Sequence, residues 1–326
     1  MNYKPTVLVS ENKTIFQTSF LNKMWEQYFN IEIIDLNKNY DKHSTVVVSQ
    51  SEEFSNGQDI DERILANKGV RHVIDHCWDS WDSSSDNNAD FVLRPRDFIR
   101  INESIWYKHL KYDKLELTSN PTRNFLLLIN KATEWRTDLY NMLKPVLQDN
   151  IYSYVQKGIL LQNAPDQELN NTTWQRYIDP NWYTSTRFSI VSESICDSYY
   201  INIKEKIRFQ PTDDICVSEK TLKPCAFKHP SIIWGQAGTL AWQKRQGFET
   251  FDHCIDETYD TIKDKNLRLK KVIEQINLCI ADKSVFTDPL TQQKLKHNYN
   301  HFYNQEVVVN LFKAQMVDPL LEFIES

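Results

Sequence analysis

The sequence has few glycines, no long apolar run and no paired cysteines, and each absence disfavours a class of protein. Only six of its 326 residues are glycine, and neither a G-x-G-x-x-G fingerprint nor a P-loop is present. A dinucleotide-dependent dehydrogenase and a P-loop ATPase are therefore disfavoured. No apolar run approaches the roughly 18 residues that span a bilayer, and no signal-peptide region precedes the first strand-like segment. We expect a cytoplasmic protein without a membrane span.

Metal sites and structural disulfides also lack support in the sequence. The six cysteines are scattered without C-x-x-C or Cys/His ligand spacing, which favours buried, reduced thiols. The only D-x-D motif, Asp59-Ile60-Asp61, falls at a predicted helix start, where an acidic side chain more often caps the helix. We therefore predict no metal site.

The charge balance argues against a general binder of nucleic acid. The formal net charge is −6, whereas binding to a phosphate backbone depends on clustered lysine and arginine. Residues 1–120 hold 14 basic and 19 acidic side chains, but residues 201–245 hold eight and four. The basic segment is therefore local, and it surrounds an acid-base pair, Glu219-Lys220.

Alternating strands and helices in the first third of the chain predict an α/β domain. Apolar runs predict strands at Thr6–Ser10, Ile31–Leu36, Ser44–Ser49 and Val70–Asp75, and helices are expected at Ser19–Phe29 and Asp59–Asn67. Strands that alternate with helices form βαβ units and a mostly parallel sheet. A polar turn near residue 120 ends this first predicted domain, residues 1–120.

The same alternation restarts and predicts a second α/β domain over residues 121–285. The continuous apolar run Asn124–Ile129 is typical of a buried parallel strand. Further strands are expected at Asn150–Val155, Phe188–Ser192 and Pro230–Gly235, and helices near Thr239–Gln246 and Asn266–Ala281. Residues 286–326 are expected to form a helical tail.

Polar and charged side chains occur where strands of the second domain end or a helix begins. Asn130 to Arg136 follow one strand, Glu193 ends another, and Glu219-Lys220 begin a helix. Ligands of open α/β sheets bind outside the carboxyl ends of the strands, so we expect these residues to meet at one edge. Each also has a plainer interpretation, as a surface helix residue or a helix cap.

The chemistry of these side chains suits a nucleotide sugar. A helix start with free backbone N–H groups favours phosphate, and Lys220 and Arg136 could pair with a diphosphate. Glu219 could accept hydrogen bonds from the two hydroxyls of a ribose. This combination is what a nucleotide-sugar site requires.

Four segments of the second domain follow one another in a recognisable order: Ile129 through Arg136, Phe188 through Ser194, Ile215 through Lys220 and Pro230–Gly235. Over residues 124–260 they resemble the donor-binding half of a GT-B glycosyltransferase, most of all the α1,3-fucosyltransferase family. That family carries S-N-x-x-x-x-x-R, F-x-x-E-N with a different spacing, Y-x-T-E-K and a P-V-V-x-G-like strand. Here Ser194 stands in place of the asparagine and Ser218 in place of the threonine.

The resemblance implies a fold and a reaction. The fold would be GT-B-like, with two Rossmann-like domains facing a cleft and the C-terminal helices closing back. The reaction would transfer a sugar from a GDP- or UDP-linked donor to a hydroxyl, with inversion and without a metal or other cofactor. Arg136 and Lys220 would neutralise the diphosphate, Glu219 would hold the ribose, and Glu193 would act beside the sugar or nucleotide. The residues expected to bind the donor are Asn130, Arg136, Ser218, Glu219 and Lys220.

Residues 247–260 also resemble a segment of uncharacterised viral relatives of these enzymes, which suggests a viral-type protein in a host cytoplasm. The general base is expected from the first domain, where Asp75 ends a strand before the aromatic-rich loop His76–Asp82. Glu52 and Glu53, after another strand, are second choices. His229, which precedes a proline, is expected to be structural.

Two other functions remain open from the sequence. A viral transferase that glycosylates hydroxymethylated DNA bases would need a basic groove, which the acidic first domain disfavours. A non-catalytic nucleotide-sugar-binding protein would hold the donor without transferring the sugar. The acceptor, a glycan or another hydroxyl compound, and the identity of the sugar are not encoded in any motif that we recognise.

Overall fold

The computed structural model describes residues 4–10, 24–34, 46–50, 71–75, 91–93, 98–117, 120–163, 178–194, 196, 201–203, 206–208, 215 and 217–326. The chain forms two compact units. Unit 1 contains residues 1–109, 199–214 and 305–326, and unit 2 contains residues 110–198 and 215–304. Each unit has its own five-stranded sheet and its own apolar core.

Unit 1 is built on a parallel sheet. Its strands are β1 (Thr6–Ser10), β2 (Asn30–Ile34), β3 (Val46–Gln50), β4 (Arg71–Asp75) and β5 (Phe91–Leu93). They lie in the order β2-β1-β3-β4-β5, and every neighbouring pair is parallel. This is the strand order of doubly wound, flavodoxin-like sheets. The four strands predicted from the sequence are present, and the ends of three of them differ from the prediction by one or two residues.

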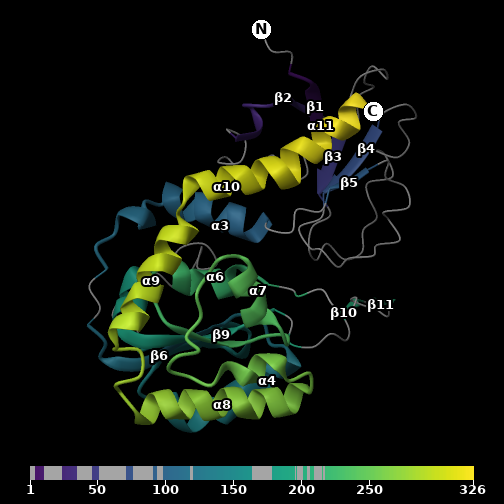
Figure 1. Ribbon diagram of the computed structural model, residues 1–326. Helices are drawn as coiled ribbons and strands as arrows, with labels where there is room; N and C mark the ends of the chain where they lie inside the picture. The colour runs from purple at the N-terminus through teal and green to yellow at the C-terminus, as the bar shows by residue number, and fades with distance from the viewer. Residues whose placement is uncertain are drawn as a thin grey trace. The chain divides into compact units, whose positions relative to one another are not determined.

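Helices from distant parts of the chain complete unit 1. Helix α3 (Phe98–His109) packs against α10 (Gln305–Phe312), and α11 (Asp318–Glu325) packs against β5 (Figure 1). A π-helical segment, Lys313–Val317, joins α10 to α11. The rings of Trp25 and Phe312 meet edge to face in the core, with centroids 4.8 Å apart. The C-terminal helices therefore close back onto N-terminal residues, as expected. A short antiparallel ribbon, β10 (Ile201–Ile203) with β11 (Lys206–Arg208), also belongs to this unit.

Unit 2 has a sheet of a different strand order. Its strands are β6 (Arg123–Ile129), β7 (Ile151–Tyr154), β8 (Ile159–Gln162), β9 (Thr186–Ser192) and β12 (Ser231–Trp234). The order is β12-β9-β6-β7-β8, with all pairs parallel except β7 with β8. Counted along the chain this is the 3-2-1-4-5 order of a Rossmann sheet, whose order reverses between β6 and β9.

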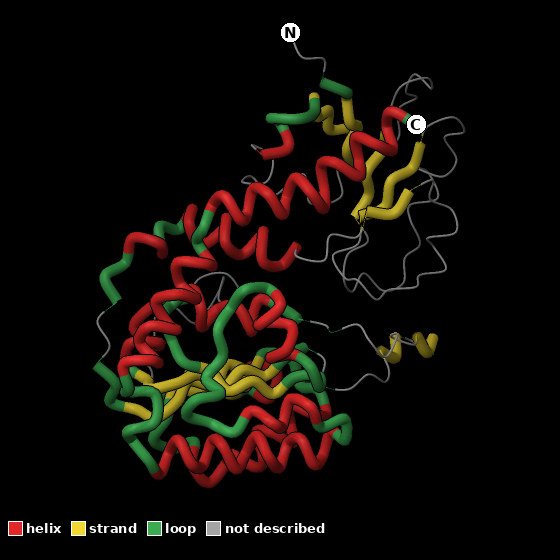
Figure 2. The backbone as a smooth tube through the Cα atoms, in the orientation of Figure 1, coloured by secondary structure: helices red, strands yellow, loops and turns green. Residues whose placement is uncertain are grey.

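Helices cover both faces of the unit 2 sheet (Figures 1 and 2). Helices α4 (Glu134–Leu143) and α8 (Lys265–Ala281) lie on one face. Helices α6 (Glu219–Ala226), α7 (Thr239–Arg245) and α9 (Pro289–Phe302) lie on the other. A short helix, α5 (Pro180–Thr184), leads into β9. Single 3₁₀ turns occupy Tyr112–Lys114, Lys144–Val146, Val155–Lys157 and Glu257–Thr261.

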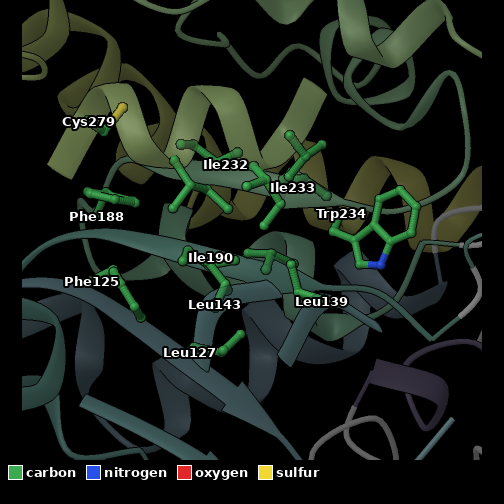
Figure 3. Close-up of a cluster of buried hydrophobic side chains, with 14 of the residues drawn as sticks. Phe125, Leu127, Leu139, Leu143, Phe188, Ile190, Ile232, Ile233, Trp234 and Cys279 are labelled. Carbon is green, nitrogen blue, oxygen red and sulfur yellow. The ribbon is translucent and has the colours of Figure 1, made fainter. Parts of the chain in front are cut away.

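The core of unit 2 follows from strands that are apolar on both faces. Leu127 of β6 and Ile190 of β9 are paired in register and point with Leu139 and Leu143 of α4 into one cluster (Figure 3). Ser189, the neighbour of Ile190, instead bonds His229 beyond the end of α6. Alternation along β9 therefore directs even-numbered residues toward α4 and odd-numbered residues toward α6.

The α/β fold class predicted from the sequence is confirmed by these two parallel-dominated sheets. The strand β8, which runs antiparallel at one edge, was not predicted. The helix expected at Asp59–Asn67 lies outside the described residues. Among the helices that the structure describes, none is both long enough and apolar enough to cross a membrane.

Candidate functional site

The predicted donor residues cluster at the point where the strand order of unit 2 reverses. Parallel strands β6 and β9 are neighbours, with Leu127 opposite Ile190, and this register continues to place Asn130 level with Glu193. Both strands present their carboxyl ends at this edge of the sheet. A crevice outside the carboxyl ends of strands at such a reversal is where open α/β sheets bind ligands. The topology and the polar residues therefore identify the same edge.

Glu193, the first residue after β9, is buried and fixed by the start of α6. Its side chain has no solvent exposure. Its carboxylate accepts hydrogen bonds from the backbone N–H and the hydroxyl of Ser218, from the N–H and the hydroxyl of Thr221, and from the N–H of Ser194. These donors satisfy both oxygens of the buried carboxylate, which in turn satisfies the first N–H groups of α6. The side chain of Glu193 therefore occupies the start of α6.

This arrangement corrects one expectation. The start of α6 was expected to offer free N–H groups to a phosphate, but those of Ser218 and Thr221 bond Glu193. The hydroxyl of Ser218, the N-cap residue, also accepts from the N–H of Lys220. Sequence reasoning could not anticipate this, because the direction of Glu193 depends on its packing against α6. An anionic ligand at this edge must therefore be bound mainly by side chains.

Arg136 extends from the first turn of α4 to the end of β9. Its Nε lies 3.2 Å from the carbonyl oxygen of Glu193, and its Nη2 lies 3.4 Å from that of Ser192. The side chain is only 3% exposed, and burial lowers the pKa of its guanidinium, against the opposing effects of Glu193 and Glu219. Arginine remains protonated in proteins despite such a shift. The positive charge is therefore held at the end of β9.

Lys220 reaches the same residues from α6. Its Nζ lies 2.8 Å from Oε1 of Glu219 and 3.2 Å from each of the hydroxyl oxygens of Ser194 and Ser218. The three N–H bonds of the ammonium group thus have three oxygen acceptors. Arg136 and Lys220, which belong to helices on the two faces of the sheet, therefore both contact the segment 192–194 at its carboxyl edge, one through its carbonyls and the other through a hydroxyl.

Glu219 is clamped between two lysines. Its Oε1 pairs with Lys220 at 2.8 Å and with Lys223, one turn further along α6, at 3.6 Å. Burial raises the pKa of Glu219, but the charges of Lys223 and Lys220 and the hydrogen bond from Lys220 outweigh it and lower the pKa to about 2. Glu219 is therefore a permanent hydrogen-bond acceptor near neutral pH. Lys223 was missed as a site residue, although its i,i+4 spacing from Glu219 is a readable signal.

The backbone after β12 forms a tight wall beside Glu193. A Cβ atom at Gly235 would lie 2.9 Å from Oγ1 of Thr239 and 3.3 Å from Cγ of Glu193. The buried guanidinium of Arg268 donates to the carbonyl oxygens of Gly235 and Cys196. Thr239 and Glu193 therefore leave no room for a side chain at position 235. Arg268 holds the backbone at Gly235, after β12, and at Cys196, after β9.

Two hydroxyls near Arg136 are buried without a hydrogen-bond partner among the residues that the structure describes. They are Oγ1 of Thr133, the N-cap residue of α4, and Oγ of Ser192. Ser192 is even-numbered on β9 and so is directed toward α4, the helix that carries Arg136. A buried hydroxyl without a partner is costly, so a polar ligand or water that reached it would be stabilised.

The remaining predicted residues are placed less completely. Asn130 follows β6, and its carbonyl oxygen accepts from the N–H of Gln156; within the described residues its side chain makes no hydrogen bond. Asp75 is the last residue of β4 in unit 1, paired with Gln50 and Leu93 in the sheet. Glu52, Glu53, the loop His76–Asp82 and the motif Asp59–Asp61 lie outside the described residues. Within the described residues, no three His, Cys, Asp or Glu side chains are grouped to hold a metal ion.

His229 and the described cysteines have structural roles. Nε2 of His229 donates to the carbonyl of Thr186, and Nδ1 lies 2.8 Å from the hydroxyl of Ser189. Burial lowers the pKa of His229 to about 4, despite the hydrogen bond to Thr186, so the ring is neutral. Among the described cysteines, those at 196, 254 and 279 are free thiols, as expected.

Comparison with known proteins finds weak similarity to solved structures. No protein-family model matches the sequence, and no curated protein matches it. A crystal structure of α1,3-fucosyltransferase with GDP is similar at 11% identity, over 97% of this chain and 92% of that chain, with a TM-score of 0.48. The structure of α1,3-fucosyltransferase with GDP-fucose gives 11% identity, 94% and 92% coverage and a TM-score of 0.40. A structure titled for the identification of the pyruvate reductase of Chlamydomonas reinhardtii is similar at 12% identity, over 97% of this chain and 98% of that chain, with a TM-score of 0.24. TM-scores below 0.5 at such identities do not transfer a function from one chain to another.

Proposed function

We propose that this chain is a glycosyltransferase that binds a nucleoside-diphosphate sugar at the carboxyl edge of the unit 2 sheet. The observation that supports it best is the convergence of Arg136 and Lys220, from separate elements, on residues 192–194. Two fixed cations at the reversal point of a Rossmann sheet suit a diphosphate. The order of the sequence motifs resembles that of fucosyltransferases and supports the same choice.

Each side chain has a defined part in this proposal. Arg136 and Lys220 neutralise the diphosphate, and their charge stabilises it further as the sugar leaves. Glu219, ionised and clamped, accepts hydrogen bonds from the ribose hydroxyls. Asn130 and Ser218 border the same edge. Because these cations compensate the leaving charge, the proposed transfer does not depend on a metal ion. Direct attack by the acceptor hydroxyl on the sugar carbon, as in the resembled family, makes the proposed transfer inverting.

Two carboxylates are proposed for different tasks. Asp75, at the carboxyl end of β4, remains the proposed general base that takes the proton from the acceptor hydroxyl. The carboxylate of Glu193 is enclosed by N–H and hydroxyl donors, so we assign it to positioning α6 and Lys220 rather than to proton transfer. It lies next to the reacting centre without acting on it.

Calorimetric titration with GDP and with UDP tests the donor site. Wild type is expected to bind one of the two, and Lys220→Met to bind it at least about tenfold more weakly, because one charge-assisted contact to phosphate is lost. Lys271→Met is the matched control, since Lys271 is an exposed lysine that pairs only with Glu274 on α8 in the described structure. Its affinity should equal that of wild type.

Two results would contradict the proposal. Binding of neither nucleotide by wild type would remove the donor site, and equal affinities of wild type and Lys220→Met would remove Lys220 from it. A transfer assay with the sugar donor of the bound nucleotide then separates an enzyme from a binding protein. Donor that binds but is neither hydrolysed nor transferred, with a panel of sugar acceptors, identifies a non-catalytic binder.

A further inference from the structure

Helix α6 carries two lysines, Lys220 and Lys223, and the proposed function gives a role only to Lys220. Lys223 is the more buried of the two. Its side chain is 12% exposed, compared with 23% for that of Lys220. Its Nζ lies 3.6 Å from Oε1 of Glu219, one helical turn away. Residues at positions i and i+4 lie on the same face of a helix, so this pair forms without distortion of α6.

Lys223 differs from Lys220 in what it contacts. Lys220 bonds the hydroxyls of Ser194 and Ser218 as well as Glu219, and so reaches the end of β9. The described contact of Lys223 is with Glu219 alone. An ammonium group that is nearly buried and paired with one carboxylate is poorly placed to bind phosphate itself. It is well placed to hold that carboxylate.

Both ion pairs end on the same oxygen of Glu219. Oε1 lies 2.8 Å from Nζ of Lys220 and 3.6 Å from Nζ of Lys223. Two cations on one oxygen restrict rotation about the terminal torsion of the side chain, which is otherwise broad for glutamate. The second oxygen is thereby given a fixed direction, and the low pKa of Glu219 keeps it an acceptor.

We infer that Lys223 is a positioning residue that orients Glu219 toward the ribose, so that the site selects ribonucleotides over 2′-deoxyribonucleotides. This inference rests on the proposed function. A fixed carboxylate that accepts from a vicinal diol loses a hydrogen bond when one hydroxyl is absent, and the oxygen is left unpaired. A carboxylate free to rotate can turn to the remaining hydroxyl or to water. Selectivity therefore depends on Lys223, although Lys223 does not touch the nucleotide.

The test is the ratio of two dissociation constants, measured by calorimetry with GDP and 2′-deoxy-GDP, or with UDP and 2′-deoxy-UDP if UDP is the ligand. Wild type is expected to prefer the ribonucleotide by about tenfold. Lys223→Met should reduce that preference to about threefold or less, as expected for the loss of one partly buried ion pair. Its affinity for the deoxynucleotide should change by less than about twofold. Lys223→Arg should restore the preference.

A double-mutant cycle makes the role specific. Glu219→Gln should lower the preference on its own, and adding Lys223→Met to it should change nothing further, because the oriented carboxylate is already gone. Lys271→Met is again the matched control. If Lys223→Met does not fold, as judged by its thermal melt, Glu219→Gln carries the test.

The outcomes separate this inference from the proposed function. An unchanged preference in Lys223→Met or in Glu219→Gln overturns the inference, as does an equal loss of affinity for both nucleotides. Wild type that binds no nucleoside diphosphate overturns the proposed function instead.

Discussion

The starts of helices α6 and α7 are capped in the same way but differ in the charged side chains around them. Both helices belong to unit 2, and both have their first N–H groups bonded to a buried carboxylate from elsewhere in the chain. Glu193 bonds the start of α6, and the two oxygens of Asp260 accept from the N–H groups of Leu240 and Ala241 at the start of α7. Neither helix therefore offers these N–H groups to a ligand.

What distinguishes the two starts is the side chains around them. Lys220 stands in the first turn of α6 and Lys223 one turn further along, both pairing with Glu219, and Arg136 contacts the end of β9 next to them. The cation near Asp260 is Arg268, whose guanidinium is buried and bonded to backbone carbonyls. A helix dipole satisfied by an internal carboxylate no longer attracts an anion by itself. The comparison teaches that basic side chains, more than helix starts, define the candidate site.

The largest expected effect comes from removing the carboxylate at α6. Glu193→Gln should lower the free energy of unfolding by about 3 kcal/mol, because an amide cannot accept from all the donors of Ser218 and Thr221. Nucleotide affinity should fall at least about tenfold, since Ser218 helps to place Lys220. Urea denaturation followed by circular dichroism and calorimetry measure the two quantities.

Glu249→Gln is the control for that change. The side chain of Glu249 is exposed on the surface of unit 2, so both quantities should match wild type within about 0.5 kcal/mol. A Glu193→Gln protein as stable as wild type would show that the buried carboxylate does not hold α6.

Removing the carboxylate at α7 should affect stability without affecting binding. Asp260→Asn replaces one acceptor oxygen by an NH₂ group that faces an N–H donor, so we expect a loss of about 2 kcal/mol in the free energy of unfolding. The affinity for the nucleotide should stay within about twofold of that of wild type. If Asp260→Asn weakened binding as strongly as Glu193→Gln, the two helix starts would be equivalent and the distinction drawn between them would fail.

The sequence placed the candidate site residues at one edge of the sheet because parallel strands bring their carboxyl ends together there. Arg136 and Lys220, far apart in the chain, were expected at the same edge, and both contact residues 192–194 there; their part in binding a donor stays a prediction. The direction of Glu193 was not predictable, because a residue just after a strand can turn to either face. Only the packing of α6 against β9 turns Glu193 toward Ser218.

The positions of the strands were also more predictable than their order. Apolar runs located β1, β4, β6 and β9 to within one or two residues. The two sheets nevertheless have different orders, since order depends on which way each crossover connection returns, and no local pattern encodes that direction. The antiparallel β8 follows β7 through a short turn at Gly158, whose φ of 74° suits glycine. The packing of α10 and α11 in unit 1 likewise depends on distant apolar partners such as Trp25.

Gly235 lies between the two helix starts and should couple them. In Gly235→Ala the new methyl group would press on Thr239, the first residue of α7, and on the side chain of Glu193. We expect a loss of about 1.5 kcal/mol in the free energy of unfolding, as for overpacking of a core, with weaker nucleotide binding.

Gly158→Ala is the contrasting variant, because its Cβ would meet nothing within 4 Å while its φ is positive. It should lower stability through backbone strain and leave binding unchanged; equal binding by both variants would argue against pressure on Glu193.

The smallest expected effect is a difference in pH dependence between the two helix starts. Lys223 and Lys220 lower the pKa of Glu219 to about 2 against the effect of burial, so its ionised form stabilises the folded protein above the ordinary pKa of a glutamate. That contribution should be lost as the pH falls toward 2, and the stability advantage of wild type over Glu219→Gln should shrink by about 1 kcal/mol, allowing for solvent screening.

The effect expected at Asp260 has the opposite sign. Burial raises the pKa of Asp260, so protonation favours the folded state, and the stability advantage of wild type over Asp260→Asn should grow as the pH falls. Urea denaturation of the three proteins between pH 7 and pH 3 distinguishes the two signs. If the stability differences of both variants from wild type changed in the same direction with pH, Lys220 and Lys223 would not lower the pKa of Glu219 relative to that of Asp260.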